Sequence, residues 1–160
     1  MSTYRFRPAT NADVPLLRRW RARPHVVAWW GSPENEDPEE VLADKRVAMW
    51  IVEHEGRPFA YAQDYSPQNW AEHPFAHLPH GSRGIDQYIG EPDLLGCGHG
   101  RAFVSAHCEQ LFDVGAPAIG TDPHPDNDRA IRSYEHAGFT IVDGPLDTLW
   151  GRAVLMERWR

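Results

Sequence analysis

The chain has little cysteine and no long apolar run. Cys97 and Cys108 are the two cysteines among its 160 residues. Two thiols do not make a disulfide framework, so we expect a protein of the reducing cytoplasm. No run of about 18 apolar residues occurs, and the first residues alternate polar and apolar side chains without the apolar core of a signal peptide. We therefore expect neither a membrane span nor a secretory leader.

Positive charge is also scarce, and the formal net charge is −7. Nucleic-acid binding requires clustered Lys and Arg, so the charge argues against a nucleic-acid partner. The acidic balance favours a cationic partner, although an ordinary acidic protein has the same composition. A chain of this length is expected to form one domain, residues 1–160, with a substantial core of its own.

The pattern of apolar and turn residues predicts a mixture of strands and helices. Strands are expected over residues 4–8, 48–53, 59–65, 83–89, 117–121, 139–142 and 148–156. Helices are expected over residues 14–20, 38–46, 98–114 and 126–137. Such a mixture indicates an α+β or α/β layered architecture. Residues 66–82, which contain three prolines and show no periodicity, are expected to form a long loop.

Some helix boundaries carry explicit signals. Thr10 and Asp13 have the spacing of a capping box before the first helix. That helix is expected to end before Pro24, and Trp29–Gly31 is expected to be a turn. Gly138 is expected to stop the last helix in the left-handed conformation that glycine adopts readily.

A glycine-rich run, Leu95–Gly100, precedes the predicted helix over residues 98–114. Glycine permits positive φ and close approach, so the backbone amides of such a run can turn toward phosphate oxygens. The start of the helix adds its positive end. A tight strand-to-helix turn without a ligand is the alternative for an isolated run of this kind.

A second run, Thr121–Phe139, starts the last predicted helix. It places Asn127, Ala130 or Ile131, and Tyr134 on one helix face, at spacings of three, four and seven residues. An amide and a phenol on one face suit a pantetheine arm and a departing thiolate. The order and separation of the two runs predict an acyl-CoA site.

These segments resemble the GCN5-related N-acetyltransferase superfamily and, within it, the aminoglycoside 6′-N-acetyltransferases. Further similarity lies in His25–Gly31, Tyr61–Tyr65, Arg83–Gln87 and Ala153–Met156, and extends roughly from residue 4 to residue 156. The resemblance implies a mostly antiparallel twisted sheet of about seven strands, with helices on both faces and a splay between strands four and five. It also implies acetyl-CoA as the acyl donor, bound in the splay, and direct transfer in a ternary complex.

The resemblance implies roles for individual residues. Asp86, in Gly-Ile-Asp-Gln, would bind the acceptor amine and help to deprotonate it, which an alkylammonium requires before it can attack. Tyr134 would protonate the CoA thiolate. Cofactor contacts would come from Tyr88, Ile89, Gly96, Cys97, Gly98, His99, Gly100, Arg101, Asn127 and Ala130. The alternatives are an exposed strand-end aspartate, a packing tyrosine, and a helix-capping asparagine.

Aromatic residues and histidines offer two further interpretations. Trp29, Trp30 and Tyr65 form an aromatic wall for a sugar or amine-bearing ring, or else they are core residues. The spacing of His73, His77 and His80 suggests a metal site, but intervening prolines interrupt the helix that such spacing needs, and no metal is predicted.

The leading hypothesis is acetylation of a primary amine, the 6′-amine of an aminoglycoside. The resembling enzymes carry extra acidic residues before the fourth strand and near the C-terminus. This chain has Gln68, Asn69 and Glu72 in the first region and Leu149–Arg152 in the second. An acetyltransferase for another small amine, a siderophore hydroxylamine or a protein amine stays open, as does a non-catalytic acyl-CoA-binding module.

Overall fold

A computed structural model describes residues 3–160, within which seven strands and five α-helices occur. The strands are β1 (Tyr4–Pro8), β2 (Val47–His54), β3 (Arg57–Tyr65), β4 (Arg83–Ile89), β5 (Ala118–Thr121), β6 (Thr140–Thr148) and β7 (Gly151–Trp159). The helices are α1 (Val14–Arg21), α2 (Pro24–Trp30), α3 (Pro38–Ala43), α4 (His99–Asp113) and α5 (Asp128–His136).

The strand order is β1-β2-β3-β4-β5-β7-β6. β1 pairs with β2, β5 with β7, and β6 with β7 in antiparallel fashion, whereas β4 and β5 are parallel. The parallel ladder comprises Arg83 opposite Ile119 and Gly84 opposite Gly120. The mixed sheet confirms the predicted α+β class and its splay between the fourth and fifth strands.

The chain divides into two compact units, Met1–Gln63 with Gln87–His99 and Asp64–Asp86 with Gly100–Arg160. The single domain expected over residues 1–160 stays a prediction, and its first two residues lie outside the described part of the chain. No helix within residues 3–160 combines the length and apolar character needed to cross a membrane.

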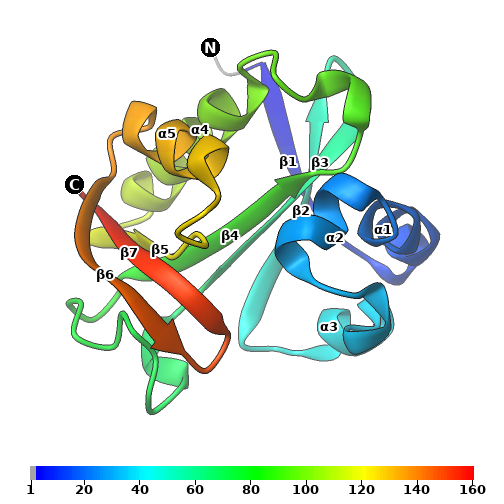
Figure 1. Cartoon of the computed structure of the whole chain (residues 1–160). Helices are drawn as coiled ribbons and strands as arrows, with labels where there is room; N and C mark the ends of the chain where they lie inside the picture. The colour runs from blue at the N-terminus through cyan, green and yellow to red at the C-terminus, as the bar shows by residue number, and fades with distance from the viewer. Residues whose placement is uncertain (1–2) are drawn as a thin grey trace. The chain divides into compact units, whose positions relative to one another are not determined.

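The first unit contains β1, β2 and α1 to α3, drawn in blue to cyan in Figure 1. Its core joins one face of α1 to the central strands. Leu17 and Trp20 on α1 pack with Met49 and Ile51 on β2 and with Tyr61 on β3. The i, i+3 spacing of the two α1 residues gives that helix its buried face. The predicted capping box of Thr10 and Asp13 is present before α1.

The second unit contains α4, α5 and the strands β5 to β7, which Figure 1 shows in yellow to red. The long loop over residues 66–82 packs onto these strands through Phe75 and Leu78, which contact Ala118 and Leu155. A Cβ atom at Gly120 would lie 2.6 Å from the Phe75 ring. Glycine is therefore required on β5 for the loop to approach the sheet.

Helix α2 is not predicted from the sequence. It begins at Pro24, directly after the extended Arg23. The first helix does end before Pro24, as expected, but Pro24 then occupies the first turn of another helix. Proline is compatible with that position because the amide it lacks would have no partner within the helix. Residues assigned to a turn, Trp29 and Trp30, are thus the last turn of α2, and Gly31 ends it with φ of 79°.

The last two predicted strands are misplaced. The sixth strand is predicted over residues 139–142 and the seventh over residues 148–156, whereas β7 spans Gly151–Trp159. In the structure β6 continues to Thr148, and two register shifts between Ile141 and Leu146 accommodate the glycine and proline. β6 is the edge strand, where the missing amide of a proline costs no ladder hydrogen bond on the open side.

Candidate functional site

A pair of carboxyl groups lies where β4 and β5 end their parallel ladder. Asp86 is on β4 and half-buried, and Asp122 directly follows β5. Burial, repulsion from Asp86 and a hydrogen bond to Asp86 raise the pKa of Asp122 well above its ordinary value of 3.8. Two carboxyl groups that share a hydrogen bond cannot both ionise readily. Asp122 therefore keeps its proton to a higher pH than an ordinary carboxyl does.

The hydroxyl of Tyr65, the last residue of β3, is hydrogen-bonded to Asp86. Burial and the negative charges of Asp86 and Asp122 raise the pKa of Tyr65 well above 10.0, so its neutral phenol donates to the Asp86 carboxylate. The Asp86 carboxyl on β4 is consequently hydrogen-bonded to both Tyr65 and Asp122.

His73 extends this hydrogen-bond chain from the loop over residues 66–82. The Phe75 amide donates to His73 Nδ1 at 3.1 Å, and His73 Nε2 lies 3.3 Å from the Tyr65 hydroxyl. Because Nδ1 accepts, the geometry assigns the proton of the neutral ring to Nε2, which donates to Tyr65. Burial lowers the pKa of His73 to about 4, so the ring is neutral at pH 7.

Backbone geometry sets the position of Tyr65 relative to Asp86. Successive strand residues point to opposite faces, so Gly84 and Asp86 lie on one face of β4. A Cβ atom at Gly84 would lie 2.4 Å from Cε2 of Tyr65. The phenol ring therefore lies directly over the Gly84 backbone, beside Asp86, and any side chain at position 84 would displace it.

Two tryptophans lie beside Tyr65 and His73. Trp70 packs edge-to-face against Tyr65, with ring centroids 5.2 Å apart, and against Trp150, with centroids 6.5 Å apart. The Trp150 ring also lies 5.1 Å from that of His73 and is 55% exposed. The predicted aromatic wall comprises Trp29, Trp30 and Tyr65. Trp70 packs against Tyr65, Trp150 packs against Trp70, and a role of Trp29 and Trp30 in binding the acceptor stays a prediction.

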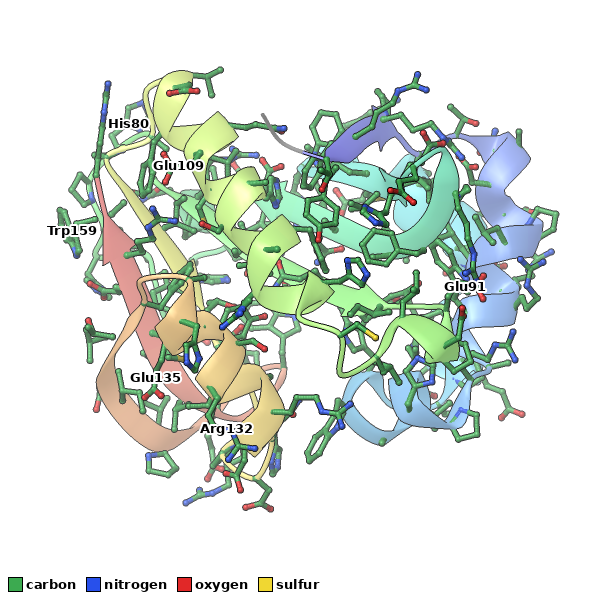
Figure 2. All side chains as sticks on the ribbon, turned by 90° about the horizontal axis from the view of Figure 1, so that it is seen from above. His80, Glu91, Glu109, Arg132, Glu135 and Trp159 are labelled. Atoms are coloured by element: carbon green, nitrogen blue, oxygen red, sulfur yellow. The ribbon has the colours of Figure 1, made fainter. Side chains whose placement is uncertain are left out.

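Tyr134 lies on the inner face of α5. It is buried and packs edge-to-face against Phe139, with ring centroids 5.6 Å apart. Its neighbours Arg132 and Glu135 lie on the exposed side of the same helix, as Figure 2 shows. Tyr134 also contributes to the raised pKa of Tyr65, which places the two phenols within electrostatic reach of each other. The packing role is therefore realised, and the role of Tyr134 as a proton donor stays a prediction.

Asn127 caps the N-terminus of α5. Its side-chain oxygen accepts a hydrogen bond from the Ala130 amide at 3.2 Å. The helix-capping alternative is therefore realised, and it fixes the orientation of the side chain. The roles of Asn127 and Ala130 in cofactor binding stay predictions.

The glycine-rich run adopts positive φ at two of its glycines. Gly96 and Gly98 have φ of 71° and 83°, and α4 begins at His99. A Cβ atom at Gly96 would meet no atom within 4 Å, so the positive φ, not crowding, requires glycine there. The His99 ring hydrogen-bonds the Tyr4 hydroxyl at 2.8 Å, and Cys97 is an exposed free thiol. Gly100 is half-buried and Arg101 exposed.

Tyr88 and Trp30 belong to an aromatic cluster in the first unit. Tyr88 stacks on Tyr61 with centroids 5.3 Å apart, and Trp30 meets Tyr88 edge-to-face at 4.9 Å. Burial raises the pKa of Tyr88. The carbonyl of Ile89 accepts a hydrogen bond from His25 Nε2 at 2.8 Å. Trp29, in contrast, is 47% exposed.

The three histidines of the loop serve separate contacts. His73 bonds Tyr65, His77 pairs with Glu157 at 3.0 Å, and His80 lies on the surface in Figure 2. Within residues 3–160, no group of three His, Cys, Asp or Glu side chains is placed to hold a metal ion.

Asp122 is not among the predicted site residues, although it lies in the run Thr121–Phe139. A usable signal was present: Asp122 directly follows one strand and Asp86 lies within the strand that is adjacent and parallel to it, and ligand sites tend to lie at such places in a sheet. Trp150 and His73 had no such signal, because a loop and a hairpin turn bring them to the site.

Residues 9–144 match the family model of the acetyltransferase (GNAT) domain. The chain is 39% identical to aminoglycoside N(6′)-acetyltransferase type 1 of Klebsiella pneumoniae, over 94% of this chain and 80% of that protein. Its structure is similar to AAC(6′)-Ib in complex with parmomycin and acetyl-CoA, at a TM-score of 0.87 and 37% identity over 99% of this chain and 94% of that one. A complex of AAC(6′)-Ib with coenzyme A and kanamycin matches at a TM-score of 0.85 and 36% identity, covering 98% and 95% of the two chains.

Both the family model and the relative cover most of the chain, and the seven-stranded fold agrees with them. The chain belongs to the GNAT acetyltransferases and, among them, to the family of the aminoglycoside N(6′)-acetyltransferases.

Proposed function

We propose that this chain transfers the acetyl group of acetyl-CoA to the 6′-amine of an aminoglycoside. The observation that carries the proposal is the hydrogen-bonded Asp86–Asp122 pair, because two adjoining carboxyl groups suit a cationic amine. The family supplies the reaction type: its relatives are named aminoglycoside N(6′)-acetyltransferases, and related structures hold acetyl-CoA or coenzyme A. The cytoplasmic location expected from the sequence stays a prediction.

The reaction requires two proton transfers at opposite ends of the new bond. Asp86 would hold the ammonium group and accept its proton, which frees the nitrogen lone pair. The nitrogen attacks the thioester carbonyl, the N–C bond forms, and the C–S bond breaks as the tetrahedral intermediate collapses. Tyr134 would give its proton to the departing thiolate, and the second amine proton is lost to solvent. Alignment of the two substrates supplies much of the rate.

Acetyl-CoA fits the backbone of the glycine-rich run. Gly96 and Gly98 adopt the positive φ that turns successive amides toward an anion, and the following helix α4 has 15 residues and a full N-terminal dipole. These amides would hold the pyrophosphate. Asn127 and Ala130, at the start of α5, would contact the pantetheine arm.

The aromatic surroundings of Asp86 suit an acceptor amine that is attached to a ring. Tyr65, Trp70 and Trp150 present ring faces and edges beside the carboxyl pair. Sugar rings pack through their C–H faces on such side chains, and the ammonium gains a cation–π contribution. A polyamine without rings would use the carboxylates but not this wall.

Product analysis tests the proposal. The protein should acetylate kanamycin at the 6′-amine, as mass spectrometry and NMR of the product would show. A matched aminoglycoside with a 6′-hydroxyl in place of that amine should release no CoA above background. Turnover of a simple monoamine without turnover of any 6′-amino aminoglycoside would instead favour the small-amine hypothesis. Acetyl-CoA binding without turnover of any amine would favour the binding-module hypothesis.

A further inference from the structure

A buried charge cluster lies directly behind the carboxyl pair, and the proposed reaction does not use it. Asp64 precedes Tyr65 on β3, Arg83 opens β4, and His107 lies in the middle of α4. Asp64 and His107 are 3% and 2% exposed. Buried ionic groups are costly, so their presence next to a site calls for a role.

The cluster has specific geometry. Oδ1 of Asp64 accepts two hydrogen bonds from Arg83, from Nε at 2.9 Å and from a terminal nitrogen at 2.6 Å. The other oxygen, Oδ2, lies 3.2 Å from Nε2 of His107. One carboxylate therefore ties together two strands and the helix that covers them. Charge-assisted bonds of this kind are the stronger ones in proteins.

The cluster and the acceptor residues lie on opposite faces of the same two strands. Asp64 and Tyr65 are neighbours on β3, so their side chains point to opposite faces. Arg83 and Asp86 are three residues apart on β4 and also point to opposite faces. His107 faces inward from α4, whereas Glu109 on the same helix points to the surface (Figure 2).

The Asp64–Arg83 ion pair lies at the short ladder that sets the register of β4 against β5. Arg83 is opposite Ile119 in the two-pair parallel ladder of β4 and β5. Beyond it, the Thr121 hydroxyl donates to the Ile85 carbonyl at 3.1 Å. With so short a ladder, few backbone hydrogen bonds hold the ends of β4 and β5, and so the separation of Asp86 from Asp122, in place.

We propose that Asp64 is a positioning residue for acetyl transfer: by binding Arg83 and His107 it fixes β3 and β4 so that Tyr65 and Asp86 meet Asp122. This inference rests on the proposed role of Asp86 in binding the amine. It assigns no contact between Asp64 and substrate.

The main test is Asp64→Asn, with steady-state kinetics over a pH series. We expect kcat/KM for the amine to fall at least about tenfold, with KM for acetyl-CoA unchanged. The acid limb of the profile should move to lower pH, because a wider spacing weakens the repulsion between Asp86 and Asp122. The matched control is Glu157→Gln, which removes another buried carboxylate of the same unit, paired with His77. It should lower the melting temperature without moving the pH profile.

A double variant separates positioning from stability and from charge. Asp64→Leu with Arg83→Met removes both charges, and replacing a buried ion pair with apolar residues is often neutral or stabilising. We expect its melting temperature to return toward wild type while kcat/KM and the shifted profile do not. If the double variant regains the wild-type melting temperature, kcat/KM and pH profile together, the cluster has only a structural role and the inference is wrong.

Asp86→Asn, measured alongside, distinguishes failure of the positioning inference from failure of the proposed role of Asp86. If Asp86→Asn loses turnover while the Asp64 variants keep the wild-type rate and profile, the positioning inference alone is wrong. If Asp86→Asn also keeps wild-type turnover, the proposed role of Asp86 is wrong and the positioning inference falls with it.

Discussion

The carboxyl groups of Asp122 and Asp86 are hydrogen-bonded just beyond the parallel ladder of β4 and β5, and this contact raises the pKa of Asp122. While Asp122 is protonated, the pair carries at most a single negative charge. A bound ammonium stabilises the second charge and favours release of the proton. Binding of the amine and ionisation of Asp122 are thus linked, so the pH dependence of amine binding reports the ionisation of Asp122.

The first prediction concerns Asp86. Asp86→Asn keeps the size of the side chain but removes the charge and the proton acceptor. Turnover should therefore fall by roughly 10²–10⁴-fold, with KM for acetyl-CoA little changed. The measurement is CoA release with kanamycin as acceptor. Asp113→Asn, at the exposed end of α4, is the control for loss of one negative charge and should keep wild-type turnover. Equal turnover of the two variants would make Asp86 a bystander.

The second prediction concerns stability against pH. The pKa of Asp122 is raised in the folded state, so folding retains its proton and stability is lost as pH rises from about 3.8 through the raised value. Asp122→Asn has no proton to lose at this position. Its melting temperature relative to wild type should therefore increase between pH 4 and pH 7. A difference that is independent of pH in this window would contradict the protonated pair.

The same variant should change amine binding. In the wild type, kcat/KM for a cationic amine should rise with pH as Asp122 ionises, because the pair then carries two negative charges. Asp122→Asn should lack this rise and have a larger KM for the amine, with KM for acetyl-CoA unchanged. Initial rates at several pH values and constant ionic strength measure both effects. Constant ionic strength matters because salt screens the charges that contribute to binding.

The third prediction concerns the glycine-rich run. Acetyl-CoA should raise the melting temperature. At about a hundredfold excess over Kd, its binding raises the free energy of unfolding by about 2.7 kcal/mol. Gly98→Asp should abolish this gain by placing a carboxylate against the phosphates. Gly115→Asp is the matched control, because Gly115 also has positive φ and is exposed, after the end of α4. If acetyl-CoA at saturation leaves the wild-type melting temperature unchanged, the run is not a cofactor site.

The fourth prediction concerns Tyr134. Tyr134→Phe removes the phenol proton but keeps the ring that packs against Phe139. The melting temperature should change little, whereas kcat should fall at least about tenfold, and by less than for Asp86→Asn if water protonates the thiolate. Wild-type kinetics in this variant would leave Tyr134 with its packing role alone.

The fifth prediction concerns the aromatic wall. Trp150→Ala should raise KM for an aminoglycoside about fivefold, since an aromatic contact is worth about 0.5–1.5 kcal/mol, with kcat nearly unchanged. Trp159→Ala is the control, because Trp159 is 56% exposed against 55% for Trp150, and it lies at the end of β7 (Figure 2). Equal effects of the two substitutions would show that the wall does not contact the acceptor.

Local patterns in the sequence were sufficient for elements whose signals are local. The strand of residues 83–89 and the capping box of Thr10 and Asp13 agree with the structure, because alternation and caps depend on nearby residues. The same reasoning failed at Pro24 and at Gly144–Pro145. Proline indicates a boundary but does not say whether a helix begins there or an edge strand continues through it.

The candidate site divides in the same way. Asp86, Tyr134 and the glycine-rich run could be found from sequence, because their motifs are contiguous or follow one helix face. Asp122, His73 and Trp150 required the structure, since three separate segments bring them to Tyr65 and Asp86. The sequence by itself determined which chemical groups are available and where glycine permits positive φ in the run before α4. Only the tertiary structure decided which carboxyl has its pKa raised, because burial and the distance between two charges exist only after the strands have paired.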